Sequence, residues 1–208
     1  MSAPDEIPFR RKAMELLRRG PFKRYIVGSA ISDTGTWMQV MAQGWVLSTL
    51  TNSALMLGTV NLAAGLPTLL LTMIGGSAAD RYDKRIILII AQVVQIALAT
   101  TLGFLVLYGY VQVWHILVLA ALLGVVIAFE MPALSALVPE LVRKDQIASA
   151  VALDRSVFHG SRLLGPSVAG LFIAWWGAAM VFFANAVTFI ALIVSMLTIP
   201  TRTLGTAE

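Results

Sequence analysis

The sequence alternates between long apolar stretches and short polar links. Six stretches of about 20 residues or more follow this pattern, at residues 25–47, 54–78, 86–108, 113–132, 148–175 and 178–199. A helix rises about 1.5 Å per residue, so about 20 residues cross the roughly 30 Å hydrocarbon core of a bilayer. The pattern predicts an all-α membrane protein in which residues 25–199 form a six-helix transmembrane bundle. Residues 1–24 precede the bundle as a basic leader, and residues 200–208 follow it as a tail.

Composition agrees with this architecture and excludes several classes of function. Hydrophobic residues make up 58% of the 208 residues and charged residues only 12%, whereas charged residues make up about 25% of a typical soluble domain. The chain has no cysteine, which excludes disulfides, thiol catalysis and thiolate metal sites. No zinc-site spacing, phosphate-binding loop or nucleophile elbow occurs in the sequence, so we predict neither a metal, a cofactor nor an enzymatic activity.

The positive charges are distributed unevenly between the links. Of the 15 Lys and Arg residues, all except Arg155 and Arg162 fall in the leader, in the links after the second and fourth spans, or in the tail. Links rich in Lys and Arg stay on the cytoplasmic side of a membrane. We therefore expect a multi-pass protein of the bacterial inner-membrane type with both termini in the cytoplasm. The net charge of +4 then reflects orientation in a lipid bilayer, and we predict no nucleic-acid partner.

A charged link between the second and third spans carries the most specific motif. Residues 75–85 read GGSAADRYDKR, two glycines followed by an acid and then by paired bases. This motif resembles the signature loop of the major facilitator superfamily. The residues that fit the loop are Gly76, Asp80, Arg81, Lys84 and Arg85, and Asp83 stands where the family usually has glycine. The resemblance implies a conformational latch between the two halves of a transporter, and a plain positive-inside loop is the alternative.

A second motif lies in the fifth span. Ser161, Gly165 and Ala169 are spaced four residues apart, which places three small residues on one helix face for close packing. Together with Pro166 and Gly170, they resemble the antiporter motif of the same superfamily, with Ser161 and Ala169 in place of two glycines. Pro166 removes a backbone donor and favours a bend. The resemblance implies an exporter, and ordinary small-residue packing is the alternative to a direct role in coupling.

The first span has a polar face. At about 100° per residue, six polar residues fall within an arc of about 120°, which we expect to face a water-filled cavity. These residues are Ser29, Ser32, Asp33, Thr36, Gln39 and Gln43. An ionisable side chain within a span is a functional candidate, so Asp33 is a candidate carrier of a coupling proton. A structural carboxylate bonded to neighbouring helices is the alternative.

Two arginines lie within the fifth span instead of at its end. Arg155, His159 and Arg162 share one helix face, where two guanidinium groups repel each other unless they meet acids or an anionic substrate. Asp154 and Glu130 are the candidate acidic partners. Arg155 is near enough to the cytoplasmic surface to extend into water, whereas Arg162 lies about 10 Å deeper. The candidate proton or substrate site comprises Asp33, Thr36, Gln39, Gln43 and Arg162.

Nearly the whole chain resembles the first half of a major facilitator transporter. Residues 34–39 and 129–141 are similar to the exporter branch that includes enterobactin-type exporters. Drug antiporters of the superfamily usually carry an arginine in the fourth helix, and this span has none, so their proton route does not carry over. The superfamily has twelve helices in two halves with the substrate between them. A complete site therefore needs a second six-helix half, as a separate chain or a second copy.

These observations predict the N-terminal half of a secondary active transporter, a proton-coupled exporter of small molecules. The alternative is a truncated, non-transporting membrane module that dimerises or associates with another transporter half. The sequence does not identify the substrate, because half of the binding pocket would come from elsewhere.

Overall fold

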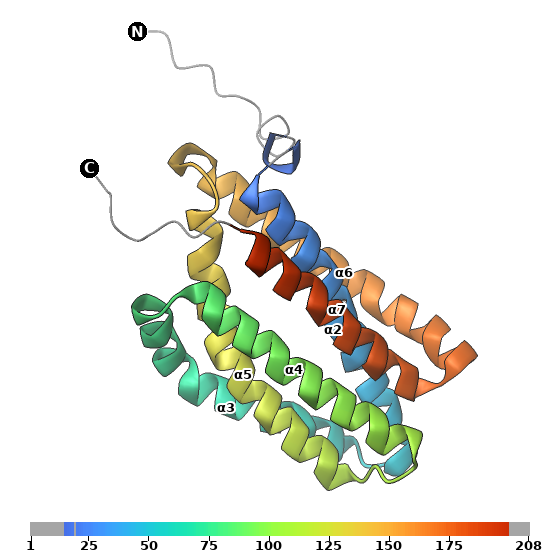
Figure 1. The fold of residues 1–208 in the computed structure, drawn as a ribbon. Coiled ribbons are helices and arrows are strands. Elements are labelled where there is room, and N and C mark those ends of the chain that lie inside the picture. The colour runs from blue at the N-terminus through green and yellow to red at the C-terminus, as the bar shows by residue number, and fades with distance from the viewer. Residues whose placement is uncertain (1–14, 19, 200–208) are drawn as a thin grey trace, which may run out of the picture.

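Six long helices make up the described part of the chain. The computed structural model describes residues 15–18 and 20–199 and has no strand in these ranges. In chain order the helices are α2 (Pro21–Leu50), α3 (Ala54–Arg81), α4 (Lys84–Leu107), α5 (Val113–Glu140), α6 (Ile147–Trp176) and α7 (Ala178–Thr198), with the 3-10 helix η1 (Lys144–Gln146) before α6 (Figure 1). The predicted all-α class is confirmed. Most of the predicted leader and the tail lie outside the described residues.

Each helix covers one predicted span, and several extend beyond it. α2 begins with Pro21 in its first turn. Proline is favourable there because the first backbone N–H groups of a helix make no hydrogen bond within the helix. The predicted end of the fourth span at Pro132 is wrong for the helix, because α5 continues through Pro132 and Pro139 to Glu140. In a bundle, neighbouring helices and side chains satisfy the carbonyls that an internal proline leaves without a partner. With 28 residues, α5 is about 42 Å long and extends beyond a bilayer core.

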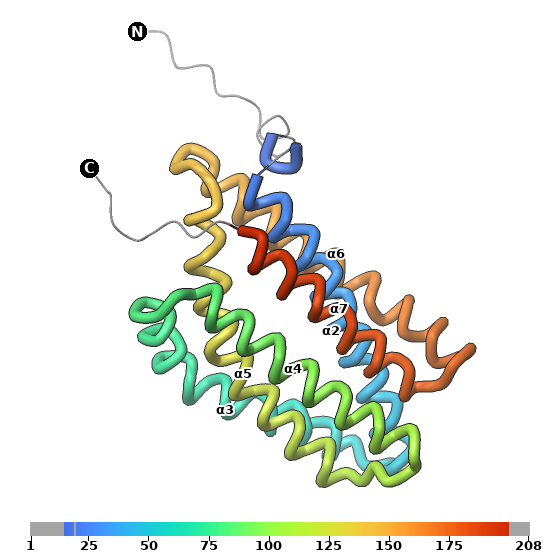
Figure 2. The backbone as a smooth tube through the Cα atoms, in the orientation of Figure 1, coloured from blue at the N-terminus to red at the C-terminus, as the bar shows by residue number. Residues whose placement is uncertain are grey.

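The helices pack in two groups that α4 joins. α2 packs against α6 and α7, α3 packs against α5, and α4 contacts both α5 and α7. Figure 1 and Figure 2 show the helices lying side by side along the long axis of the bundle. One apolar core includes Tyr25, Leu88 and Met196, and a second includes Leu47 and Phe182. Polar residues fall between the members of these two cores along three helices: Ser29, Ser32 and Asp33 on α2, Gln92 and Gln95 on α4, and Asn185 on α7.

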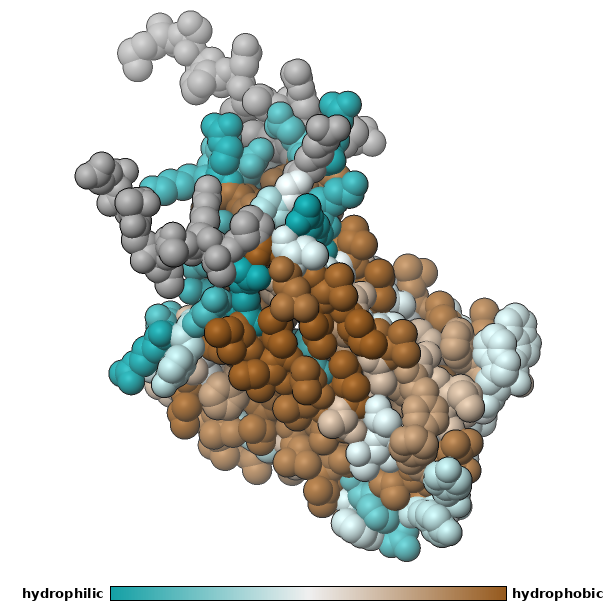
Figure 3. Space-filling model, viewed as in Figure 1, coloured by the Kyte–Doolittle hydropathy of each residue, from teal (hydrophilic) through white to brown (hydrophobic). Residues whose placement is uncertain are grey.

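The outer surface of the bundle is apolar. Large hydrophobic side chains are exposed on every long helix, most strongly on α3, where Met73 is 86% exposed. Figure 3 shows a broad apolar surface next to a hydrophilic end. In the described part of the chain, α3, α4, α5 and α7 are long and apolar enough to cross a membrane. α2 and α6 are at least as long but carry charged side chains such as Asp33 and Arg162. Apolar surface of this extent fits a multi-pass membrane protein.

The basic links gather at one end of the bundle. The start of α2, the end of α7, the turn between α3 and α4, and η1 all lie at this end (Figure 1). There, Arg24 Nη1 donates a hydrogen bond to the carbonyl oxygen of Thr198 at 2.6 Å, which ties α2 to α7. We call this end of the molecule the basic end. Its Lys and Arg residues include Arg24, Arg81, Lys84, Arg85, Arg143 and Lys144.

Candidate functional site

The loop between α3 and α4 is held by a helix cap and by two contacts to other helices. Asp83 precedes α4, and its carboxylate accepts the backbone N–H of Arg85 at 2.9 Å, an N-cap that accounts for an acid at this position. Lys84 Nζ lies 3.0 Å from Glu140 Oε1 at the end of α5. Arg85 Nε donates to the carbonyl oxygen of Met196 on α7 at 3.0 Å. Two bases of the motif therefore join the start of α4 to both of its neighbours.

The two glycines of this motif differ in their surroundings. Gly75 is buried, and a Cβ at this position would overlap the carbonyl oxygen of Ala128, so the backbones of α3 and α5 touch here. A Cβ on Gly76 would meet nothing within 4 Å. Asp80 and Arg81 at the end of α3 are exposed. Close packing thus uses Gly75, and the latch role of Gly76, Asp80 and Arg81 stays a prediction.

A carboxylate inside the bundle joins α5 to α4 and α2. Glu130 accepts hydrogen bonds from two glutamines of α4, Gln92 Nε2 at 2.6 Å and Gln95 Nε2 at 2.8 Å. Gln92 Oε1 accepts in turn from Ser32 Oγ on α2 at 3.3 Å. Both glutamines and Ser32 are buried. Buried polar groups require such partners, and among the described residues no base forms an ion pair with Glu130.

Two further acids take hydrogen bonds from hydroxyl groups. Asp33 is half-buried on α2, and Ser29 Oγ, one turn earlier, donates to its Oδ2 at 3.0 Å. Nearer the basic end, Tyr25 Oη donates to Asp154 Oδ1 on α6 at 2.7 Å. Because the donors are neutral, protonation of either carboxylate would separate no pair of opposite charges.

The polar face of α2 does not open onto a single cavity. Ser29, Ser32 and Gln39 are buried. Gln39 Oε1 accepts from Asn185 Nδ2 on α7 at 2.8 Å, whereas Ser32 faces α4. The expectation of a water-filled cavity is therefore wrong for these three residues, because their polar groups bond inside the bundle, Ser29 to Asp33 of α2 itself and Ser32 and Gln39 to neighbouring helices. The partly exposed members of the face are Asp33, Thr36 and Gln43.

The small residues of the α6 motif lie against α2. Ser161, Gly165 and Ala169 are buried, and Ser161 Oγ accepts from Thr34 Oγ1 at 3.1 Å. A Cβ on Gly165 would lie 2.5 Å from the Cβ of Trp37, so the two backbones are in close contact. These residues form a seam between α2 and α6, and a role of the seam in coupling stays a prediction.

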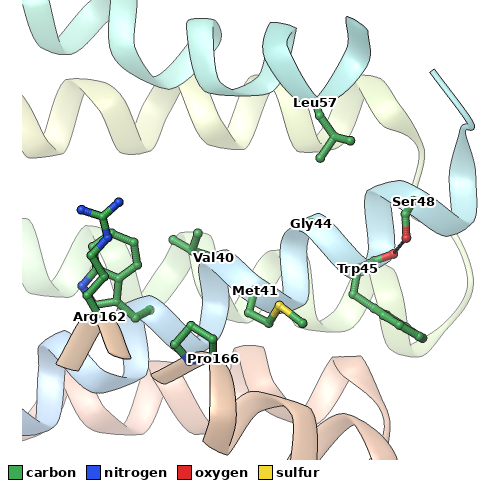
Figure 4. Close-up of a pocket in the computed structure, with 9 residues that line it drawn as sticks. Val40, Met41, Gly44, Trp45, Ser48, Leu57, Arg162 and Pro166 are labelled. Atoms are coloured by element: carbon green, nitrogen blue, oxygen red, sulfur yellow. Dashed lines mark hydrogen bonds between the residues drawn. The ribbon is translucent and has the colours of Figure 1, made fainter. Parts of the chain in front are cut away.

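A pocket of about 490 Å³ lies beside this seam, between α2, α3 and α6 (Figure 4). Leu57 lines it from α3, and Arg162 and Pro166 line it from α6. α6 runs unbroken through Pro166, and Gly170, further along, is exposed. The remaining lining residues come from one face of α2 and are Trp37, Val40, Met41, Gly44, Trp45 and Ser48.

Arg162 contacts an aromatic ring and no acid. Its guanidinium carbon lies 5.0 Å from the centroid of the Trp37 ring, a cation–π contact. Neither ion pair within the described residues involves Arg155 or Arg162. The predicted pairing of these arginines with Glu130 or Asp154 is therefore wrong, because both acids bind neutral donors inside the bundle.

The residues of the predicted proton or substrate site do not lie together in the structure. Arg162 lines the pocket, and the other members lie outside the lining: Asp33, Thr36, Gln39 and Gln43. Sequence reasoning did not identify Gln92, Gln95 and Asn185 as parts of the polar interior. Each is a strongly polar residue within an apolar span, and such residues face the inside of a bundle, so the signal was available.

Comparison with known proteins identifies relatives of this chain. The family described as transmembrane secretion effector matches residues 12–205. The chain is 29% identical to the staphyloferrin A transporter of Staphylococcus aureus over 169 residues, which cover 80% of this chain and 42% of that protein. It is 28% identical to macrolide efflux protein A of Streptococcus pyogenes, with 78% and 41% covered, and 26% identical to the multidrug efflux pump Tap of Mycolicibacterium fortuitum, with 83% and 43% covered. The chain thus spans less than half the length of these relatives.

Proposed function

The chain belongs to the transmembrane secretion effector family of the major facilitator superfamily, and we propose that it forms the N-terminal six-helix half of a secondary active exporter of small molecules. The family match over residues 12–205 carries this proposal, because it includes all six long helices. Two of the relatives are named for efflux, and one is named for transport of staphyloferrin A. Those proteins are longer, so in this proposal export requires a second six-helix half in addition to the residues of this chain.

In this proposal all six helices cross the membrane and both termini lie in the cytoplasm. With 30 residues each, α2 and α6 are about 45 Å long, enough to span a bilayer. Their polar residues are accommodated because most of them face other helices or the pocket instead of lipid. The basic end supports the orientation, since links rich in Lys and Arg remain in the cytoplasm.

Cysteine labelling tests this topology, because the chain has no cysteine of its own. Tyr82 lies at the basic end and Tyr110 at the opposite end, and their exposed fractions are similar, 67% and 71%. A membrane-impermeant maleimide added to intact cells is expected to label the Tyr110→Cys variant. The Tyr82→Cys variant should react only after the membrane is permeabilised. The reverse pattern, or equal labelling of both variants in intact cells, contradicts the proposed orientation.

Proton antiport through Asp33 is the proposed driving reaction. Asp33 is partly exposed on α2, and its hydrogen-bond donor is the neutral hydroxyl of Ser29. A carboxylate in this setting is able to accept and release a proton without disrupting an ion pair. Glu130 is less suited, because both of its oxygens are engaged by the buried amides of Gln92 and Gln95.

Proteoliposomes that contain the full chain and an imposed proton gradient test export. The probes are two fluorescent small molecules of opposite charge, fluorescein and ethidium, and gradient-dependent export of at least one of them is expected. The Asp33→Asn variant should lose the dependence on the gradient, and the Asp145→Asn variant, altered at the exposed η1, should retain it. Normal gradient dependence after Asp33→Asn would contradict the proton role. A chain that remains monomeric on cross-linking and exports neither probe would refute export and favour the non-transporting module.

A further inference from the structure

We propose that the pocket between α2, α3 and α6 binds an amphipathic organic anion, a molecule with an aromatic or other apolar body and a carboxylate that Arg162 receives. The inference rests on the proposed function only in treating this pocket as part of the path of an exported molecule. The size of the pocket, its lining and the surroundings of its charged residue favour this chemical class.

The pocket has the size and the lining of a small-molecule site. Its volume of about 490 Å³ falls within the roughly 300–1,000 Å³ of such sites, which are mostly apolar with a few placed polar groups. Trp37 and Trp45 supply two aromatic surfaces, and Met41 and Leu57 supply aliphatic ones. Ser48 offers little additional polarity, because its hydroxyl already donates to the carbonyl oxygen of Trp45 at 2.7 Å. The body of a bound molecule must therefore be apolar.

Arg162 gives this apolar pocket a positive charge. Among the described residues that line it, there is no acidic side chain, and neither ion pair of the described chain involves Arg162. The guanidinium carbon lies over the Trp37 ring, 5.0 Å from the ring centroid. This cation–π contact takes up none of the five N–H groups as a hydrogen bond to an acid, and a guanidinium binds a carboxylate with two parallel hydrogen bonds. Figure 4 shows the guanidinium projecting from α6 in the direction of α3.

The depth of Arg162 favours an anionic partner. The residue follows the start of α6 at Ile147 by 15 positions, which is about 22 Å along the helix. An arginine this far along a membrane helix is costly unless a counter-charge or water compensates it. Arg155 lies on the same face about 10 Å nearer the basic end and is also exposed. Of the two arginines, only Arg162 lines the pocket, so it is the group that receives the charge of a bound anion.

Quenching of tryptophan fluorescence tests the site directly, since two of the five tryptophans of the chain line the pocket. The probes are para-bromobenzoate and its neutral analogue para-bromobenzamide, whose bromine quenches a tryptophan on contact. With the purified full chain in detergent, para-bromobenzoate is expected to quench saturably and to bind about tenfold or more tightly than the amide. The Trp37→Phe variant should lose a large share of the quenching by the benzoate.

Two arginine variants identify the group that binds the anion. Arg162→Gln is expected to weaken binding of para-bromobenzoate about tenfold or more and to leave binding of the amide unchanged. Arg155→Gln is the matched control, because this exposed arginine of the same helix lies outside the pocket lining, and it should change the affinity less than about twofold. Equal affinity of the wild-type chain for both probes, or full retention of benzoate binding by Arg162→Gln, would overturn the inference.

The outcomes for this pocket and for the proposed function are distinguishable. Selective benzoate binding without any export of fluorescein or ethidium would keep the anion site and refute the exporter. Gradient-dependent export of ethidium by a chain that binds both bromobenzene probes equally would keep the exporter and refute the anion site.

Discussion

Replacement of Gly165 by alanine is expected to weaken the seam between α2 and α6. The added Cβ would lie 2.5 Å from the Cβ of Trp37 and 3.0 Å from both the amide nitrogen of Met38 and the carbonyl oxygen of Thr34. Carbon atoms in ordinary contact lie about 3.5–4.0 Å apart, so the two helices must separate by about 1 Å. Backbone atoms cannot rotate away as a side chain does. We therefore expect the free energy of unfolding to fall by about 1–3 kcal/mol, the usual cost of overpacking.

Gly170→Ala is the matched control on the same helix. A Cβ at Gly170 would meet nothing within 4 Å, and the residue is exposed. Alanine is more favourable than glycine in a helix by about 1 kcal/mol. The free energy of unfolding of Gly170→Ala should therefore equal or slightly exceed that of the unaltered chain. Gly165→Ala should lower this free energy, so the two alanine substitutions have different effects on stability.

Titration of the purified chain with sodium dodecyl sulfate in mixed micelles measures both free energies when helix content is followed by circular dichroism. The local geometry has its own readout, because Gly165→Ala should also change the emission of Trp37, which packs on the seam. Equal free energies for the two variants, or an unchanged stability after Gly165→Ala, would show that α2 and α6 do not touch at this position.

Three further predictions use the same titration. Gly75→Ala should lower the free energy of unfolding by about 1–3 kcal/mol, because its Cβ would overlap the α5 backbone, whereas Gly76→Ala should not lower it. An equal loss in both variants would contradict the packing of α3 on α5. Glu130→Ala should lower the free energy of unfolding by about 2 kcal/mol or more, because two buried amides lose their acceptor. Glu130→Gln should lower it less, because one carbonyl oxygen still accepts. The opposite order would refute the proposed bonding. Lys84→Gln and Glu140→Gln should each cost at most about 1 kcal/mol, and the double variant should cost little more than either single variant if the two side chains pair.

The positions of the six helices follow from the sequence because apolar length is a direct consequence of bilayer thickness. The periodicity of α2 also indicated which of its residues share a face. It did not indicate which neighbour each residue meets, because that depends on how the helices pack. Ser32 bonds to α4 and Gln39 to α7, whereas the shared face alone predicts that both line one water-filled cavity. A helical wheel describes one helix, and a polar side chain is satisfied by whichever helix lies opposite.

The same limit explains the errors about charged residues. The sequence makes Glu130 a candidate partner for the arginines of the fifth span, because opposite charges at similar depth are expected to pair. Two glutamines of α4 bind it instead. Gln92 and Gln95 are three positions apart and therefore share a helix face, which sequence reasoning is able to recognise. The identity of their acceptor on α5 depends on the register between α4 and α5, which no pattern within one helix encodes.

The placement of charge separates acids from bases in this bundle. Asp33, Glu130 and Asp154 each accept hydrogen bonds from neutral donors within the helix packing. Arg162, by contrast, is exposed on α6 and rests on an aromatic ring. Had the interior acids paired with the arginines, the bundle would be electrically satisfied and would need nothing from outside. Because they do not pair, the exposed face of α6 keeps its positive charge, and protonation of Asp33 would break no ion pair of the described residues. In the proposed exchange of protons at Asp33 for an anion at Arg162, neither step would therefore have to break an ion pair between these groups.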